Sequence, residues 1–175
     1  MAVVLDSTVG GATSNTFCTL AEAATYMEAR LNASSWETDA TTDNKNRALV
    51  EAARQLNVMS WDGRKAADTQ ALQWPRDWVV DPDSPNHFYY DNDEIPQRVK
   101  DAQCEYAFEF IRAGTTDIAA ADTNAAVIRK KVDVLETEWS PNGGRPTGIR
   151  RYPRIMALIS PLLCGSPGTI NLVRG

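Results

Sequence analysis

The stretch 96–114, PQRVKDAQCEYAFEFIRAG, decides the fold of this 175-residue chain. Proline suits the first position of a helix, because its missing N–H would have no partner there, and Gly114 is a natural helix end. One side of the predicted helix carries residues at helical spacing: Val99, Ala102, Gln103, Tyr106, Ala107, Phe110 and Ile111. Cys104 and Phe108 widen this apolar arc. We therefore expect the helix to be central.

A first helix precedes it. Residues 19–22, TLAE, predict a capping box with Thr19 as the N-cap and Glu22 at the third helical position. A helix over about 20–31 follows, which Asn32 can end. Its apolar stripe consists of Leu20, Ala23, Ala24, Met27 and Leu31.

A second helix is expected after Thr41 or Thr42, either of which can cap it. Its apolar stripe consists of Leu49, Ala52, Ala53, Leu56 and Met59. Trp36 lies in the connection between the two helices. We interpret it as a cover for the end of the helix pair rather than as a ligand-binding ring.

Helical periodicity fails over residues 60–95, where prolines stand at 75, 82 and 85. Loops of this length are uncommon in compact domains unless they have a function. Residues 67–74, ADTQALQW, are expected to form one or two helical turns before Pro75.

The C-terminal third changes character. Leu135, Thr137 and Trp139 alternate with glutamates, which predicts a strand over about 132–139. Pro153 begins a last short helix, which Pro161 bends or interrupts and which stops at Gly165. The expected fold is mainly α: a helical bundle core (about 19–114 and 127–164) with a small β element, a long central loop (about 60–95) and an extended C-terminal tail (about 165–175), in one domain over residues 1–175.

Composition narrows the class of function. The net charge of -5 argues against a broad phosphate-binding surface, and no apolar run approaches the length of a membrane span. Cys18, Cys104 and Cys164 are expected to be free thiols packed as small hydrophobes, without zinc. His87 stands in the loop without the partners of a catalytic base. We find no nucleotide-binding or nucleophile motif, so neither an enzyme nor a cofactor is expected.

One acidic cluster invites a calcium interpretation. As an EF-type loop that begins at Asp81, it would have Asn86 at the sixth position and Asn92 at the twelfth. The motif needs glycine and glutamate at these two positions. No metal site is therefore expected.

Residues 70–78, QALQWPRDW, could form a binding surface or a packed corner. Pro75 keeps Trp74 extended, so Trp74 is predicted to anchor the corner on the helix pair. Arg76 and Trp78, which follow this break, are candidates for a partner interface. The other candidates are four arginines around the last helix and three apolar tail residues: Arg145, Arg150, Arg151, Arg154, Ile170, Leu172 and Val173.

The order of the motifs resembles a family of tailed-phage and prophage proteins often labelled "DnaT-like single-stranded DNA-binding protein". Its members are similar to head–tail connector, or adaptor, proteins. The most specific blocks are QALQWPR (70–76) and IPQRVKDAQCE (95–105). Residues 77–78 and the insertion 84–93, SPNHFYYDND, make the loop longer than the family pattern, and residues 115–126 match it weakly.

The resemblance implies a structural protein of the virion neck, made in the host bacterial cytoplasm. Such adaptors form a ring, commonly dodecameric, beneath the portal protein. They extend the channel through which double-stranded DNA passes and receive tail, stopper or nozzle proteins. No catalytic residues belong to such a family.

The alternative is a single-stranded DNA-binding protein of a phage or prophage. Such binders combine a basic groove with exposed stacking rings. The tryptophans at 61, 74 and 78 stand near Arg64, Lys65 and Arg76, which favours this alternative, whereas the overall acidity argues against it.

Overall fold

The computed structural model describes residues 3–85, 88–114, 129–132, 135–138 and 148–165. The fold is mainly helical, as predicted, with small antiparallel β elements. Its α-helices are α1 (Leu20–Glu28), α2 (Thr42–Asn57), α3 (Gln97–Ala113) and α4 (Pro153–Ile159). None of the helices in the described ranges is long and apolar enough to cross a membrane.

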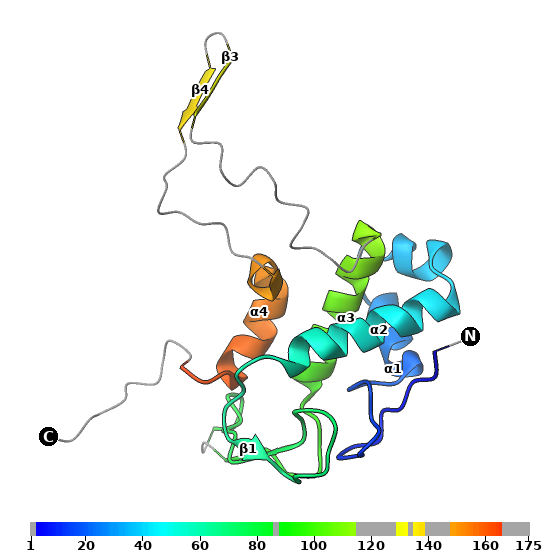
Figure 1. Cartoon of the computed structure of the whole chain (residues 1–175), viewed down its shortest axis with the longest axis vertical. Helices are drawn as coiled ribbons and strands as arrows, with labels where there is room; N and C mark the ends of the chain where they lie inside the picture. Colours follow the sequence, from blue (N-terminus) through cyan, green and yellow to red (C-terminus); the bar gives the residue numbers. More distant parts are fainter. Residues whose placement is uncertain (1–2, 86–87, 115–128, 133–134, 139–147, 166–175) are drawn as a thin grey trace, which may run out of the picture.

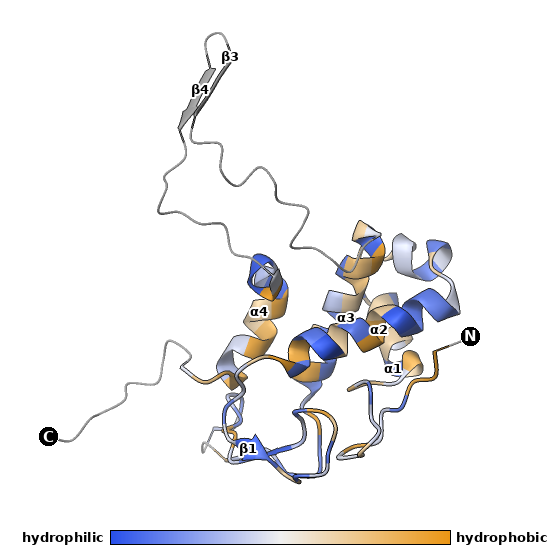
Figure 2. Ribbon diagram, in the orientation of Figure 1, coloured by the Kyte–Doolittle hydropathy of each residue, from blue (hydrophilic) through white to orange (hydrophobic). Residues whose placement is uncertain are grey.

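Helix α3 is the centre of the bundle, as the sequence predicted. It packs against α2, α4 and α1, and Figure 1 shows it behind α2 with α4 on one side. Alanines 48, 52 and 53 of α2 are buried and belong to the hydrophobic core that α2 shares with α3. Figure 2 shows hydrophilic and hydrophobic stretches side by side on α2, as expected of a helix with one buried face.

A buried amide on α3 joins three parts of the core. Gln103 Nε2 donates to Thr16 Oγ1 at 2.7 Å and to the Leu49 carbonyl oxygen at 2.8 Å. Gln103 Oε1 accepts from the Phe17 N–H at 2.9 Å. Because buried polar groups need partners, Gln103 fixes the N-terminal segment and α2 on α3.

The helix ends agree with the predicted caps, with two corrections. Thr19 and Glu22 form the full capping box, and Thr41 caps α2. Pro96 is the N-cap of α3 rather than its first helical residue. Helix α1 ends at Glu28, so Leu31 leaves the predicted apolar stripe and is exposed.

Two more helix ends differ from the prediction: α2 ends at Asn57, before Met59, and the last helical turn ends at Leu162, before Gly165. The predictions for Trp36 and for Pro153 and Pro161 are confirmed. Trp36 is buried in a short π-helix, Ser35–Asp39, that contacts α3. Helix α4 begins at Pro153, and the chain continues as a 3₁₀ turn, Ser160–Leu162, at Pro161.

The cysteine prediction is confirmed in part. The three cysteines are free, as expected. Cys18 and Cys104 are buried, with sulfurs 3.8 Å apart. Cys164 is exposed, because it follows the last helical turn. Its thiol donates to the Trp61 carbonyl oxygen.

The central loop is ordered by pairing rather than by helical turns. No helix forms over residues 67–74, so that prediction is wrong. Strand β1 (Arg64–Lys65) instead pairs antiparallel with β2 (Arg76–Asp77), which brings residues 67–74 into a compact turn. Trp61 forms an isolated bridge to Leu163, which ties the loop to the end of the last helical turn.

The β element in the C-terminal third is a hairpin. Strand β3 (Arg129–Val132) pairs antiparallel with β4 (Leu135–Glu138). The predicted strand is confirmed over β4, and the basic run before it forms the partner strand. The extended tail predicted over about 165–175 lies outside the described residues beyond Gly165.

Candidate interaction surfaces

The inner half of the central loop is a packed corner around Trp74. This residue is buried, and its ring meets Trp61 and Tyr90 edge to face, with ring centroids 5.7 Å and 6.1 Å away. The Trp74–Pro75 peptide bond is cis. The burial of Trp74 and its contacts with two rings confirm that it anchors a packed corner.

Arg76, predicted as a candidate for a partner interface, instead belongs to the buried corner. It is only 6% exposed. Its Nε donates to the Asp62 carbonyl oxygen at 2.6 Å, its Nη2 to the Gly63 carbonyl oxygen at 2.8 Å, and its Nη1 to Gln73 Oε1 at 2.7 Å. The guanidinium thus holds the turn after Trp61 closed, because it satisfies backbone oxygens that would otherwise lack partners.

The chain changes face directly after Arg76. Trp78 has φ +64°, a conformation that a bulky residue rarely adopts. Gly63 lies against this bend with φ +65°, where an added Cβ would come 2.1 Å from the Asp77 carbonyl oxygen. The bend places Trp78 outward and Val79 inward, so that Trp78 is 67% exposed while Val79 is buried.

Beyond the bend, residues 78–81 and 88–90 form what we call the aromatic arm. The Asp81 N–H donates to the Phe88 carbonyl oxygen at 2.9 Å, and the Tyr90 N–H donates to the Val79 carbonyl oxygen at 3.0 Å. Side chains alternate in paired segments. Val79 is buried and Tyr90 packs on Trp74, whereas Val80 and Tyr89 form a bridge on the outer face.

The outer face of the arm is apolar. Trp78, Phe88 and Tyr89 are 67%, 65% and 60% exposed. The Arg64 guanidinium lies over the Trp78 ring, 4.8 Å from its centroid. In the described ranges these rings and Val80 make up half of the exposed large hydrophobic side chains. Grouped apolar side chains of this kind are typical of a binding surface.

Acidic residues border the arm. Asp91, Asp93 and Glu94 follow it and are exposed. Asp83 precedes the second segment and pairs with Arg98 of α3 through contacts of 2.7–2.9 Å. The arm therefore combines apolar rings with negative charge.

A second surface, which we call the arginine groove, runs along α3 between the end of α1 and α4. Its volume is about 1020 Å³. Arg98, Glu105 and Arg112 recur at seven-residue spacing on α3, which places them on one stripe about 21 Å long at roughly 1.5 Å per residue. Arg30 from the end of α1 and Arg154 from α4 complete the lining charges.

Glu105 lies buried beneath this groove. Its carboxylate accepts from the Tyr26 hydroxyl at 2.9 Å and pairs with Arg30 and Arg154 at 3.1 Å each. Burial works to raise the pKa of Glu105, but hydrogen bonds from Arg30 and Tyr26, with the charges of both arginines, hold that pKa below its ordinary value. The Arg30 guanidinium also lies over the Phe108 ring, 3.9 Å from its centroid.

The structure divides the remaining predicted interface residues. Arg154 lines the groove, whereas Arg150 and Arg151 are exposed on the 3₁₀ turn before α4, Gly148–Arg151. Arg145 and the three apolar tail residues lie outside the described residues. Within the described ranges, no group of three His, Cys, Asp or Glu residues could hold a metal ion.

Comparison with known protein families gives a match over residues 1–175 to the family described as "Putative DnaT-like ssDNA binding protein". The protein belongs to this family. No curated protein and no solved structure matches the chain. The match confirms the DnaT-like label named from the sequence motifs.

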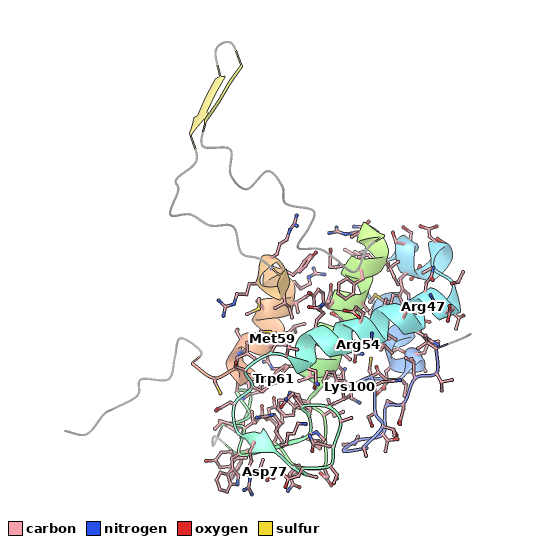
Figure 3. The ribbon with its side chains drawn as sticks, viewed as in Figure 1. Arg47, Arg54, Met59, Trp61, Asp77 and Lys100 are labelled. Carbon is pink, nitrogen blue, oxygen red and sulfur yellow. The ribbon has the colours of Figure 1, made fainter. Side chains whose placement is uncertain are left out.

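In this member of the DnaT-like family, sequence reasoning missed the groove. The signal on α3 was the seven-residue spacing of Arg98, Glu105 and Arg112. Arg154 was a predicted interface residue, but its meeting with Arg30 in the groove had no local signal, because the two residues reach it from α4 and from the turn after α1. Figure 3 shows Trp61 close to Met59, just after the end of α2, and Asp77 at the outer end of the loop. Trp61 and Asp77 are the two limits of the corner, which lies between the bundle and the arm.

Proposed function

We propose that the protein is a structural interaction protein of the virion neck: a head–tail adaptor that assembles as a ring beneath the portal protein. One observation carries the proposal. The arm presents the exposed rings of Trp78, Phe88 and Tyr89 on a loop that Trp74 fixes to the core. An exposed apolar surface on a rigid support can bind another protein with little loss of conformational entropy.

The charge around the arm favours a protein partner over DNA. Asp81, Asp91, Asp93 and Glu94 lie within or directly after the arm. Phosphates approaching the rings would meet these carboxylates and be repelled. A protein with basic and apolar side chains would be attracted.

The step from interaction protein to adaptor rests on the motif resemblance. The two most specific blocks contribute directly to the described surfaces: 70–76 forms the corner that supports the arm, and 95–105 forms the first half of α3 beside the groove. In the proposed role, the ring binds the portal on one side and tail, stopper or nozzle proteins on the other. Double-stranded DNA passes through its channel, and the role includes no catalysis.

Single-stranded DNA binding is the second candidate. The matching family's description names single-stranded DNA and not a phage connector. Two observations favour this candidate: Arg64 lies over the exposed Trp78 ring, and four arginines line the groove. All four arginines already pair with carboxylates of the same chain: Arg30 and Arg154 with Glu105, Arg98 with Asp83, and Arg112 with Glu109. These pairs reduce the charge that the groove offers to phosphates.

A salt series separates the two candidates. Labelled single-stranded DNA is titrated with the full chain in an electrophoretic mobility assay at low and physiological salt. A shifted complex that weakens steeply with salt would favour the second candidate. The adaptor proposal predicts no stable complex with DNA, together with co-sedimentation of the protein with portal-bearing, tail-less capsids.

A further inference from the structure

We propose that the arginine groove is the docking site for the acidic aromatic arm of a second copy of this chain. The inference rests on the proposed ring-forming function and names the two surfaces through which neighbouring subunits meet. It joins the arm, with its rings and carboxylates, to the groove along α3 between α1 and α4.

The groove offers accessible positive charge. Arg112 and Arg154 have side chains that are 62% and 65% exposed. Arg154 uses its Nη1 for Glu105, whose single carboxylate is shared with Arg30. Four arginines line the groove, and three carboxylates pair with them: Glu105, Asp83 and Glu109. The four arginines exceed their three carboxylate partners by one positive charge, in a chain whose net charge is -5.

The groove also has apolar parts. Leu31, in the turn after α1, is exposed and lines the groove, and Ala157 and Leu158 line it from α4. Arginine and apolar side chains together suit a segment that carries both carboxylates and rings, since guanidinium groups bind carboxylates in a bidentate manner and stack on aromatic faces.

The arm has this complementary chemistry. Its exposed rings are followed directly by Asp91, Asp93 and Glu94. Contacts within one copy illustrate both kinds of interaction. Asp83 binds Arg98 at the end of the groove through two guanidinium nitrogens, and Arg64 lies over the Trp78 ring.

A second copy is needed to bring the two surfaces together. Within one copy, the rings of Trp78, Phe88 and Tyr89 face solvent while the groove stays open. Since arm and groove are different patches on one chain, pairing them between copies makes a heterologous contact. Such contacts repeat from subunit to subunit and close into a ring when the rotation permits.

Charge reversal on each surface tests the inference by sedimentation velocity over a concentration series, at low and moderate salt. The arm variant is Asp91→Lys with Asp93→Lys, and its control is Glu37→Lys with Asp68→Lys, which changes the net charge equally at exposed positions outside the arm. The groove variant is Arg112→Glu. Its control is Arg54→Glu on α2: both arginines pair with a glutamate three residues earlier and are mostly exposed, at 62% and 73%.

The wild-type chain and both controls should self-associate, less strongly as salt rises. The association constant of each surface variant should be lower than that of the wild type by a factor of about ten or more. A mixture of the arm variant with the groove variant should form a one-to-one dimer and nothing larger, because only one intact arm and one intact groove then meet. Circular dichroism establishes that the variants are folded.

Three results would overturn the inference: a wild-type chain that stays monomeric at millimolar concentration in low salt, surface variants that associate like the wild type, or controls that lose association equally. Its failure is separable from failure of the proposed function. If the arm and groove variants still assemble on portal-bearing capsids, the subunit contact is wrong and the adaptor role stands. If the wild type self-associates through these surfaces but does not bind such capsids, the adaptor role is wrong.

Discussion

Arg76 and Trp78 are two residues apart in one loop and have opposite environments. Arg76 donates to backbone oxygens from a buried position, whereas Trp78 exposes most of its ring. In a regular extended segment, residues two apart share a face. The left-handed conformation of Trp78 breaks this alternation and separates an inner corner, which stabilises the fold, from the outer arm, which is available to a partner.

The comparison shows that residue type alone does not identify an interface. A large cation and a large ring next to a proline suggested one shared surface. The backbone conformation instead places the Arg76 guanidinium in the core and the Trp78 ring in solvent. Substitutions on the two sides of Trp78 should therefore affect different measurements: stability for the corner, and association for the arm.

The largest effect on stability is expected in the corner itself. Trp74→Ala should lower the free energy of unfolding by about 4 kcal/mol, because it removes a buried ring that packs on Trp61 and Tyr90 and leaves a cavity. Urea denaturation followed by circular dichroism measures this change. A loss below about 1 kcal/mol would contradict the corner assignment.

The groove contains a second buried anchor, Glu105. Glu105→Gln should cost about 3 kcal/mol at neutral pH, because Arg30 would keep its charge without its buried partner. The pKa of Glu105 is lowered in the folded state. Its contribution is therefore fully present above the unfolded pKa of about 4.3 and is lost as pH falls through the folded value.

Denaturation of the wild type and Glu105→Gln between neutral pH and about pH 3 tests this sign. The difference in unfolding free energy should shrink as the solution becomes more acidic. A difference that stays constant, or grows, over this range would show that the carboxylate charge is not what stabilises the cluster.

Arg76→Ala should cost about 2 kcal/mol, because several carbonyl oxygens of the turn would be left buried without donors. Arg64→Ala is the matched control. Arg64 is also an arginine of the loop, but its side chain is 67% exposed and pairs with Asp77 near the surface, so its loss should change stability by less than about 1 kcal/mol. Equal losses for the two variants would show that the buried hydrogen bonds of Arg76 do not stabilise the corner.

The smallest effect on stability is expected for Trp78. Trp78→Gly should change the free energy of unfolding by less than about 1 kcal/mol, because the exposed ring contributes little and glycine adopts φ +64° without strain. The same substitution should weaken self-association in sedimentation velocity by about tenfold. If it unfolds the protein instead, Trp78 belongs to the core side of the bend.

The helices were predictable because their signals are local. The caps at Thr19, Thr41 and Gly114 and the apolar stripe of α3 lie within a few residues of the features they determine. The end of α1 was misjudged because Leu31 continues the apolar spacing after the helix has stopped. Apolar spacing that continues beyond a helix therefore does not predict the residue at which the helix ends.

The loop and the groove were less predictable, because distant residues determine them. The bend at Trp78 depends on close approach to Gly63, and the burial of Arg76 depends on the carbonyl oxygens of residues 61–63. Glu105 lies on the same helix as the predicted core, but its partners come from α1 and α4. No window of neighbouring residues contains these pairs.

The adaptor role is tested most directly by electron microscopy of portal-bearing, tail-less capsids mixed with this protein. The adaptor proposal predicts a ring of density beneath the portal, present with the wild type and with the Arg54→Glu control. The proposal would be contradicted by images without density at the portal vertex, together with salt-dependent binding of single-stranded DNA by the same preparation.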